Sequence, residues 1–394
     1  MESRNSSPPH VMLIVETSLA YGREVLRGIS DYVVEHRPWS MYVDLRELII
    51  EPPKWIDQWK GDGIISRSTT PELAKRLQKL KIPTVDLTDI YGDVGLPHIW
   101  TDNRKVGELA ATHLLERGFR HFGYCSFTGH DWAARRLAGF REALREADCT
   151  VDVLESPWEA TQTESWEDQQ RTITEWLSRL PRPLGVFTCN DMRGQHVLDA
   201  CRRINASVPE EIAVIGVDDD DLVCGMCEPP LSSVMPNPRK IGYEAAALLD
   251  RQMQGGAALP YEQIIPPLGI TTRQSTDVLA IEDPQIASAV RFIRQHACHG
   301  ITVKDLLREI PLSRSVLERR FRKYIKRSPQ SEIRNQQIKR IKELLMETDL
   351  ALDRIAELTG FEHPEYMSVV FKRETDETPG RFRKRAQNER DIGL

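Results

Sequence analysis

The stretch ITVKDLLREIPLSRSVLERRFRKYIKRSP, residues 301–329, predicts two helices joined by a short turn. The second helix is expected to begin after Ser313, whose hydroxyl can accept a hydrogen bond from a backbone N–H of the first turn. Apolar side chains recur at helical spacing along it and form a face that can pack on the rest of the domain: Val316, Leu317, Phe321 and Tyr324. The segment therefore predicts a helix-turn-helix unit.

The same arrangement recurs about fifty residues later in ALDRIAELTGFEHPEYMSVVFKRETDETPGRFR, residues 351–383. A helix is followed by a turn at Gly360 and by a second helix from about Pro364 to Glu374. A repeated helix pair whose outward side chains are basic or polar is suited to the major groove of DNA.

Ten side chains on the outward faces of these helices are candidates for DNA contact. In the first unit they are Arg314, Ser315, Glu318, Arg319 and Arg322, and in the second they are His363, Glu365, Tyr366, Lys372 and Arg373. An arginine on such a face has two other roles, because it can simply solvate the helix or can contact a phosphate. Phosphate contacts position a protein on the duplex, whereas base contacts read the sequence.

The motifs IAELTGF, FKRE, TP and RFR resemble the signature of AraC-type regulators. The resemblance covers about residues 285–388 and implies two helix-turn-helix units joined by a long helix, here about Gln330–Glu347. Such a helix is roughly 27 Å long at 1.5 Å per residue, which suits reading helices in successive major grooves about 34 Å apart. The sequence departs from the family pattern at Asp376, where glycine is usual, and at Met367, where an aromatic residue is usual.

Upstream of this region, residues 10–274 alternate short β-branched runs with amphipathic helical segments. The strand-like runs are residues 10–15, 61–66, 82–87, 121–127, 184–190 and 212–219. This alternation predicts the α/β class, with parallel sheets covered by helices on both faces. Ligands of such sheets bind beyond the carboxyl ends of the strands. The pattern breaks at 275–284, where we place a linker, and the remaining residues are expected to be helical.

Four motifs in order, TDN (101–103), RRLAGFREAL (135–144), CND (189–191) and VIGVDD (214–219), resemble the sugar-sensing domain of LacI-type repressors and periplasmic binding proteins. That resemblance implies a two-lobed sensor. The sensor precedes the DNA-binding region here, and this order, with the segment LAYGREVLRGISDYV (19–33), resembles XylR-type xylose operon regulators.

The resemblance implies ten ligand-binding candidates in the sensor. They are Asp218, Arg136, Asn190 or Asp191, Asp102, Tyr21, Arg23 and Arg193, with Phe127 or Trp132 as a platform for a sugar ring. Carboxylates, amides and guanidinium groups around an aromatic ring suit hydroxyls that both donate and accept. Several candidates have a second interpretation: Asp102 and Asp191 can cap the helices that follow them, Arg136 can be a surface arginine, and Trp132 can belong to the core.

Charge and cysteine content narrow the function classes. From residue 281 onward the chain has 23 Lys and Arg against 18 Asp and Glu, a balance of +5, so the rest contributes −11 to the net charge of −6. A basic C-terminal region indicates a polyanionic partner. The seven cysteines include one CxxC pair, Cys224 and Cys227, without the further ligands of a zinc site, so neither metal nor cofactor is expected.

Export, membrane insertion and catalysis are not expected either. The polar N-terminus MESRNSSPPH has no signal-peptide core, and no apolar run approaches the roughly 20 residues of a membrane span, so we expect a cytoplasmic protein and not an exported solute receptor. Adjacent carboxylates such as Asp218 and Asp219 point apart on an extended segment and make a poor acid/base pair. No nucleotide-binding glycine motif is present in the sequence.

The two resemblances together imply a sugar-responsive transcription regulator. We expect a homodimeric activator of D-xylose catabolic genes that binds repeated DNA half-sites and can contact RNA polymerase. A regulator for a different pentose or monosaccharide, and a carbohydrate receptor without a DNA role, are the alternatives.

Overall fold

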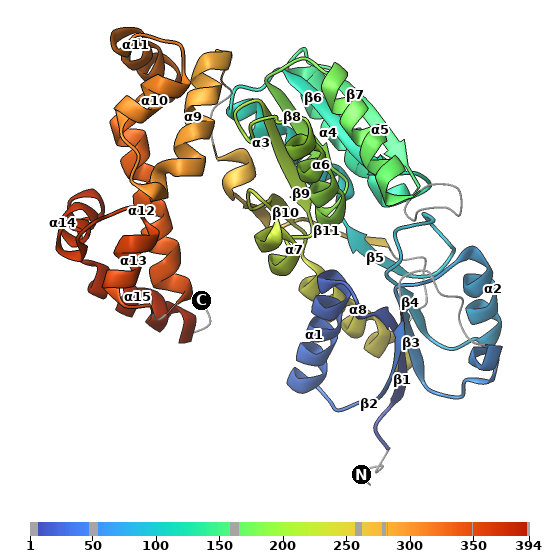
Figure 1. Cartoon of the computed structure of the whole chain (residues 1–394). Coiled ribbons are helices and arrows are strands. Elements are labelled where there is room, and N and C mark those ends of the chain that lie inside the picture. The colour runs from blue at the N-terminus through green and yellow to red at the C-terminus, as the bar shows by residue number, and fades with distance from the viewer. Residues whose placement is uncertain are drawn as a thin grey trace. The chain divides into compact units, whose positions relative to one another are not determined.

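The computed structural model describes residues 7–46, 54–157, 165–256, 262–277, 281, 283–348 and 350–391. The chain divides into two compact units, Met1–Val278 and Leu279–Leu394. The first unit contains two six-stranded sheets and the second is helical (Figure 1). The predicted fold class is therefore confirmed: a two-lobed α/β sensor precedes an all-α region.

The first lobe is built on a parallel sheet of order β11-β5-β4-β3-β1-β2. Its strands are β1 (His10–Glu16), β2 (Ser40–Arg46), β3 (Gly63–Ser66), β4 (Thr84–Asp86), β5 (His98–Thr101) and β11 (Glu262–Ile265). Its helices are α1 (Ala20–Glu35), η1 (Lys54–Gln58), α2 (Pro71–Leu80) and α8 (Pro238–Met253). Helices α1 and α8 cover one face around Val11 and Ile65, and α2 and η1 cover the other around Met12 and Ile64. Burial on both faces explains why β1 is almost continuously apolar.

The second lobe repeats this plan with sheet order β12-β10-β9-β8-β6-β7, in which β12 is antiparallel to β10. Its strands are β6 (His121–Phe127), β7 (Val151–Ser156), β8 (Leu184–Thr188), β9 (Ile212–Val217), β10 (Ser232–Met235) and β12 (Gly269–Thr271). Its helices are α3 (Asn103–Glu116), α4 (Asp131–Glu146), α5 (Trp166–Arg179), α6 (Asp191–Arg203), α7 (Asp221–Met226) and η2 (Gln274–Thr276).

The chain crosses between the lobes after β5, after β10 and after β11. Two backbone hydrogen bonds tie these crossings together, from Asp102 N to Ile265 O and from Leu268 N to Met235 O, each 2.8 Å long. The three crossing segments are therefore hydrogen-bonded to one another.

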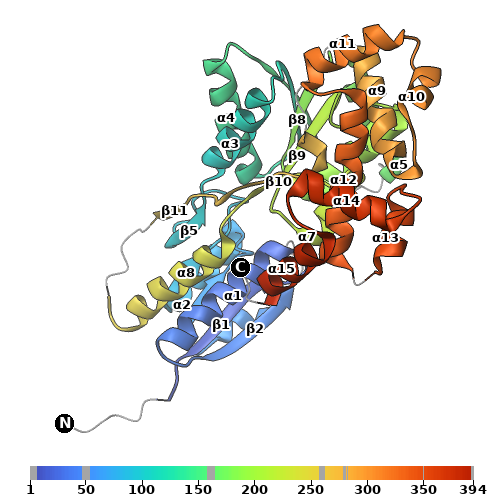
Figure 2. The ribbon, with the colours of Figure 1, turned by 90° about the vertical axis from the view of Figure 1, so that its left-hand side faces the viewer.

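The second unit consists of two helix-turn-helix pairs along one long helix. Its helices are α9 (Pro284–His296), η3 (Ala297–His299), α10 (Val303–Glu309), α11 (Arg314–Ile325), α12 (Pro329–Glu347), α13 (Leu352–Leu358), α14 (Pro364–Thr375) and α15 (Pro379–Asp391). Helices α13, α14 and α15 pack around the C-terminal half of α12, where Ile341, Met367 and Phe371 are buried (Figure 2). Helices α9, α10 and α11 contribute the buried Val290, Leu306 and Phe321, respectively.

Both departures from the AraC pattern are accommodated. Asp376 ends α14 in the left-handed region at φ 61°, and aspartate is one of the residues that adopts this conformation more readily than most. Met367 is fully buried and fills the core position itself. Ser313 caps α11 as predicted, because its Oγ accepts from Val316 N at 3.4 Å.

The predicted linker differs from the structure at its start. Ser275 and Thr276 are fully buried in η2, and Ser275 Oγ donates to Val214 O at 2.6 Å, so the sensor extends through them. The boundary between the units falls after residue 278, within the predicted linker. Residues 278–280 and 282 lie outside the described residues.

Helices α3 and α4 approach so closely that glycine is required at their contact. A Cβ added to Gly107 would lie 1.9 Å from Arg136 O, and one added to Gly139 would lie 1.9 Å from Arg104 O. Both neighbours are backbone atoms, so a side chain at either position has to push the helices apart.

We expect Gly139→Ala to lower the free energy of unfolding by about 1–3 kcal/mol, the usual cost of overpacking. Urea unfolding followed by circular dichroism measures it. Gly225→Ala is the matched control, since Gly225 is also helical and nothing lies within 4 Å of its added Cβ. Equal stability of Gly139→Ala and the wild type would show that the helices are not in tight contact.

Candidate functional site

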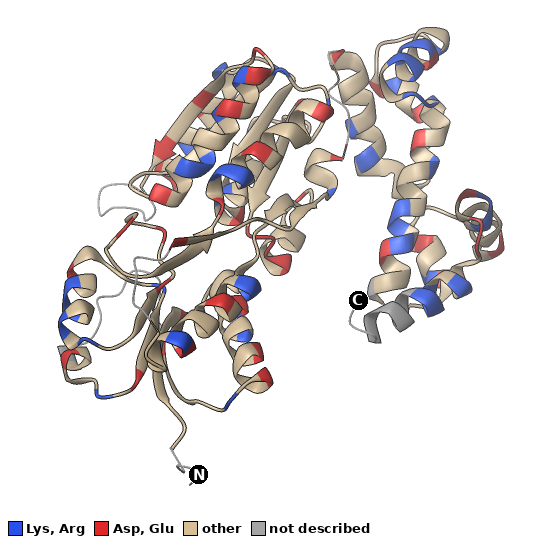
Figure 3. Cartoon of the chain, turned by 180° about the vertical axis from the view of Figure 1, so that it is seen from behind, with Lys and Arg blue, Asp and Glu red and all other residues tan. Residues whose placement is uncertain are grey.

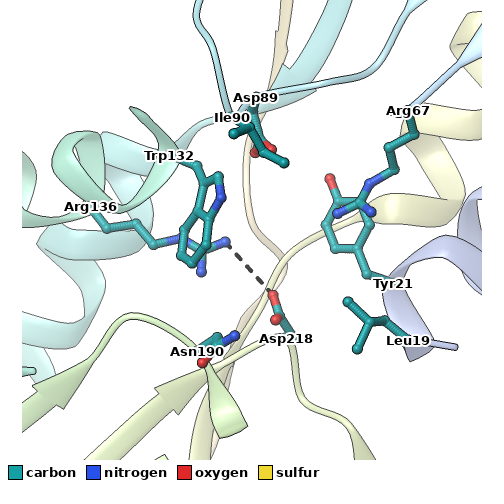
Figure 4. Close-up of a pocket in the computed structure, with 9 residues that line it drawn as sticks. All are labelled: Leu19, Tyr21, Arg67, Asp89, Ile90, Trp132, Arg136, Asn190 and Asp218. Carbon is teal, nitrogen blue, oxygen red and sulfur yellow. Dashed lines mark ion pairs between the residues drawn. The ribbon is translucent and has the colours of Figure 1, made fainter. Parts of the chain in front are cut away.

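A pocket lies between the two lobes of the sensor and encloses about 450 Å³, including the part that is open to solvent. Figure 4 shows the nine side chains that line it: Leu19, Tyr21, Arg67, Asp89, Ile90, Trp132, Arg136, Asn190 and Asp218.

The strand ends of both sheets place these side chains. Arg67 follows β3, Asn190 follows β8 by two residues, and Asp218 follows β9 directly. Because parallel strands end at the same edge of a sheet, the two lobes present these edges to one cleft. The pocket lies where the topology predicts a ligand.

Arg136 is the most firmly held side chain of the pocket and is only 4% exposed. Its Nε donates to Asn103 Oδ1 at 2.8 Å, its Nη1 donates to Cys189 O, and its Nη2 lies 3.7 Å from Asp218 Oδ1. Its guanidinium carbon also lies 4.7 Å from the centre of the Trp132 ring. Arg136 is thus a fixed donor in the pocket, and the alternative of a surface arginine does not apply.

Asp218 faces Arg136 from an unusual backbone conformation, with φ at 109°. Its backbone N donates to Val234 O at 3.1 Å, which holds the turn after β9. Burial raises the pKa of Asp218 to about 6, although the positive charges of Arg136 and Arg67 oppose the shift. A strained backbone and a perturbed carboxyl in one cleft are typical of a functional site.

The first lobe contributes a second pair of opposite charges, Arg67 and Asp89. Arg67 is paired with the fully buried Glu16, and its guanidinium carbon lies 4.2 Å from the centre of the Tyr21 ring. The Tyr21 hydroxyl shares a 2.8 Å hydrogen bond with Thr101 Oγ1, and burial raises the pKa of Tyr21.

Asn103 connects the two halves of the pocket. Its Nδ2 donates to Asp89 Oδ2 at 3.2 Å, while its Oδ1 accepts from Arg136 Nε. The amide therefore links a carboxylate of the first lobe to a guanidinium of the second.

The chemistry of the pocket suits a small uncharged polyol. The lining holds two carboxylates and two guanidinium groups, and one of the latter, Arg67, is paired with the buried Glu16 behind it. Carboxylates accept from hydroxyls, guanidinium groups donate to them, and the amide of Asn190 does both. The face of Trp132 adds an apolar surface for the C–H groups of a ring.

The structure brings five of the ten predicted ligand candidates into the pocket: Tyr21, Trp132, Arg136, Asn190 and Asp218. Of the alternatives considered, it places Asn190 in the pocket rather than Asp191, and Trp132 rather than Phe127. Their contact with a ligand stays a prediction.

Two other candidates, both aspartates, have structural contacts. Asp102 Oδ1 caps α3 by accepting from Lys105 N at 2.9 Å, which is the alternative considered for it. Asp191 does not cap α6, because the cap residue is Asn190, whose Oδ1 accepts from Arg193 N at 3.0 Å. Asp191 instead accepts from Ser233 Oγ at 2.6 Å, and burial raises its pKa.

The remaining three candidates also do not line the pocket. Arg193 is fully buried, donates to Ser156 Oγ at 2.8 Å and lies 3.9 Å from the centre of the Phe127 ring. Arg23 Nη1 donates to Thr17 O and Ser18 O, each at 2.9 Å.

Sequence reasoning missed Arg67, Asp89, Leu19 and Ile90. Arg67 directly follows a predicted strand, and Asp89 stands two residues after another, so the rule that polar residues at strand ends face the cleft would have found both. Leu19 and Ile90 carry no polar signal.

The N-terminus of α4 is hydrogen-bonded to the first lobe. Asp131 N donates to Ile90 O and Trp132 N donates to Asp89 O, each at 3.0 Å. The guanidinium carbon of Arg135 lies 3.9 Å from the centre of the Trp100 ring on β5. Two first-turn N–H groups that a helix cannot satisfy itself are therefore satisfied across the cleft.

In the second unit, all candidate DNA-contacting side chains of α11 except the half-buried Glu318 are exposed. Figure 3 shows the concentration of Lys and Arg positions along this helix. Arg314 Nε donates to Glu318 Oε1 at 3.1 Å, while Leu317 and Phe321 on the opposite face are buried. Val316 and Tyr324, predicted for this face, are half-buried.

Helix α14 also has one buried and one exposed face, but it carries fewer Lys and Arg residues than α11. His363 is its N-cap residue, and Tyr366 is 55% exposed. Glu365, Lys372 and Arg373 are exposed as well. All five candidates of this unit thus lie outside its core, while their contact with DNA stays a prediction.

Cys224 and Cys227 are free and buried, and the described part of the chain holds no cluster of three or more His, Cys, Asp or Glu side chains able to bind a metal. Among the described residues no helix combines the length and apolarity of a membrane span.

Three family models match consecutive parts of the chain: a XylR N-terminal domain at residues 10–104, a periplasmic binding protein-like domain at 111–276 and a helix-turn-helix domain at 306–385. With the fold and the pocket, these matches define a class: the protein is a sugar-sensing, DNA-binding transcription regulator.

Relatives with known names narrow the class. The chain is 32% identical to the xylose operon regulatory protein of Haemophilus influenzae over 95% of this chain and 97% of that protein. It is 31% identical to the Escherichia coli K12 protein of the same name, over 95% and 96%. The solved structure of a xylose-binding transcription activator, XylR, is similar with a TM-score of 0.82 and 28% identity, over 96% of this chain and 98% of that one. The chain belongs to the family of the xylose operon regulatory proteins.

The hydrogen bonds from the N-terminus of α4 to the first lobe predict that two substitutions at Asp131 lower sugar affinity to different extents. Asp131→Ala removes the Asp131–Arg135 ion pair but keeps the N–H that donates to Ile90 O, whereas Asp131→Pro removes both. Proline is compatible with the first helical position, and His130 before it is extended, at φ −111° and ψ 116°. We expect Asp131→Pro to bind sugar about fivefold more weakly than Asp131→Ala, because one hydrogen bond is worth about 1 kcal/mol.

Isothermal titration calorimetry of the two variants measures this difference, and their melting temperatures without sugar control for folding. Equal affinities of the alanine and proline variants would mean that the interlobe hydrogen bond does not stabilise the sugar-bound sensor.

Proposed function

We propose that the protein activates genes for D-xylose catabolism and that its sensor binds D-xylose in the pocket between the lobes. The observation that carries the proposal is the gathering of Arg136 and Asp218 from one lobe, and of Arg67 and Asp89 from the other, around a single pocket. The names of the full-length relatives, xylose operon regulatory proteins, support the same ligand.

Each side chain has a distinct role in this proposal. Asp218 and Asp89 accept from hydroxyls of the sugar, and Arg136 donates to its ring or hydroxyl oxygens. Trp132 packs against one face of the ring. Because Asp89 and Asp218 belong to opposite lobes, a sugar that binds both stabilises the closed sensor.

Closure is the signal that reaches the DNA-binding unit. A ligand shifts a conformational equilibrium only by its difference in affinity for the two states. D-xylose therefore has to bind the DNA-competent state more tightly, and the operator in turn increases affinity for the sugar.

On DNA we propose a homodimer that binds repeated half-sites, with α11 and α14 of each chain in the major groove. Helix α12, with 19 residues, is about 28 Å long, which suits reading helices in successive grooves. Activation involves contact with RNA polymerase in the cytoplasm.

Titration with D-xylose tests the sensor half of the proposal. We expect saturable binding of one sugar per chain, with D-ribose, L-arabinose and D-glucose at least tenfold weaker. Isothermal titration calorimetry measures the constants, and a thermal-shift series with the same sugars is an independent check. Tightest binding of another monosaccharide would replace D-xylose as the ligand, and no binding of any would refute the sugar site.

The pKa of Asp218 adds a pH dependence to this titration. If the carboxylate accepts from the sugar, binding requires the ionised form, so the association constant is constant above pH 6 and falls up to tenfold per pH unit below it. We expect Asp218→Asn to bind more weakly at pH 7.5 and to lose the dependence on Asp218, since asparagine also tolerates positive φ. The Asp86 carboxyl, whose pKa burial raises to about 7, also titrates in this range. An unchanged profile in Asp218→Asn would show that the dependence does not come from Asp218.

Substitutions in α11 test the DNA half. We expect Arg314→Ala and Arg319→Ala each to weaken binding to a selected duplex by about 1–3 kcal/mol if the arginine contacts a base, and to relax the preference at one base pair. Arg202→Ala is the matched control, since Arg202 is equally exposed on α6 of the sensor. Fluorescence anisotropy at fixed salt measures the affinities. Wild-type affinity in both α11 variants would remove α11 as a reading helix.

A further inference from the structure

Helices α11 and α14 are equivalent at an offset of fifty positions. Arg314 and Pro364 are their first residues, and both helices end at a left-handed residue, Lys326 at φ 63° and Asp376 at φ 61°. Phe321 and Phe371 occupy the same buried position. Residues fifty apart therefore face the same way in the two units.

The outward position of Arg319 is occupied by Val369 in the second unit. Val369 is 63% exposed, whereas its neighbour Val370 is fully buried in the core. Core packing thus accounts for Val370 but does not account for Val369. Tyr366, one turn earlier on the same helix, is also exposed, so the outward face of α14 has an apolar centre.

The two helices also differ in charge. Helix α11 has five Arg and Lys against one Glu, while α14 has two of each sign, Lys372 and Arg373 against Glu365 and Glu374. Both cations of α14 lie in its last turns. The N-terminal half of α14, which enters the groove first in this class of motif, offers no positive side chain.

The major groove limits what such a face can recognise. Arginine pairs with guanine O6 and N7, whereas an apolar side chain finds one apolar group at the base edges, the C5-methyl of thymine. An exposed valine in the position equivalent to Arg319 fits that methyl group. Glu365, one turn before Val369, can accept from a neighbouring cytosine amino group.

We propose that Val369 is a specificity-determining residue that reads a thymine methyl group in the half-site bound by α14. The inference rests on the proposed mode of DNA binding and adds to it a division of labour: α11 reads through charged side chains, and α14 reads through apolar contact.

Replacement of thymine by deoxyuridine tests this, because it removes the methyl group alone. The full-length chain with D-xylose selects a duplex from a random library, and each thymine of that duplex is then replaced singly. Fluorescence anisotropy gives the affinity of each duplex for the wild type, Val369→Ala and Arg319→Ala. Val34→Ala is the matched control, since Val34 is an exposed valine on α1 of the sensor.

We expect the wild type and Val34→Ala to lose about three- to fivefold at one thymine per half-site, the factor for one buried methyl group. Val369→Ala should lose affinity for the original duplex and become insensitive at that thymine alone, while Arg319→Ala keeps the sensitivity. The inference is overturned if Val369→Ala retains the wild-type pattern, or if it loses equally on thymine and uracil duplexes. A chain that selects no duplex overturns the proposed DNA-binding mode as well, and the two failures are thereby distinguished.

Discussion

The buried guanidinium of Arg136 is the interaction on which the sensor depends. A buried cation is costly unless all of its donors are used, and here Asn103, Cys189 O and Asp218 accept from it or pair with it. Its partners come from α3, from the end of β8 and from the end of β9. A single side chain therefore fixes how three elements of the second lobe meet at the cleft, and it leaves donor capacity for a ligand on the side of Asp218.

The same helix that holds Arg136 also meets the other lobe. Helix α4 supplies Arg136 from its second turn and the backbone N–H groups of Asp131 and Trp132 from its first. The acceptors of those N–H groups belong to Asp89 and Ile90, which also line the pocket. Ligand contact and lobe contact thus share one loop and one helix. In the proposed mode of binding, a sugar that contacts Asp89 also orders the carbonyls that accept from the N-terminus of α4, which would couple sugar binding to lobe closure.

Several strands that are buried on both faces could be predicted from the sequence. Strand β6 was predicted at its observed bounds because all of it except His121 is buried, which makes the run largely apolar. The edge strands β2 and β7 were missed, and so were the interior strands β5 and β10, whose short runs HIWT and SSVM contain polar residues. In the site, Asp218 and Arg136 stand in motifs of recognisable order, whereas Arg67 and Asp89 do not. Asp102 follows a strand and its carboxylate caps α3, and the sequence left both roles open because a cap residue and a ligand contact look alike in it.

The duplicated helix pair explains why one fold can hold two kinds of recognition. The core positions of the repeat are kept, with Leu317 and Met367 buried at the same place, so each reading helix is presented in the same way. The outward positions are under no such constraint, because exposed side chains contribute little to stability. Helix α11 carries a net positive charge, whereas positive and negative charges balance on α14. Phosphate attraction supplies affinity without sequence information. In the proposed mode of binding, the additional cations of α11 therefore strengthen the hold on the duplex, while both helices read bases, α11 through charged and α14 through apolar side chains.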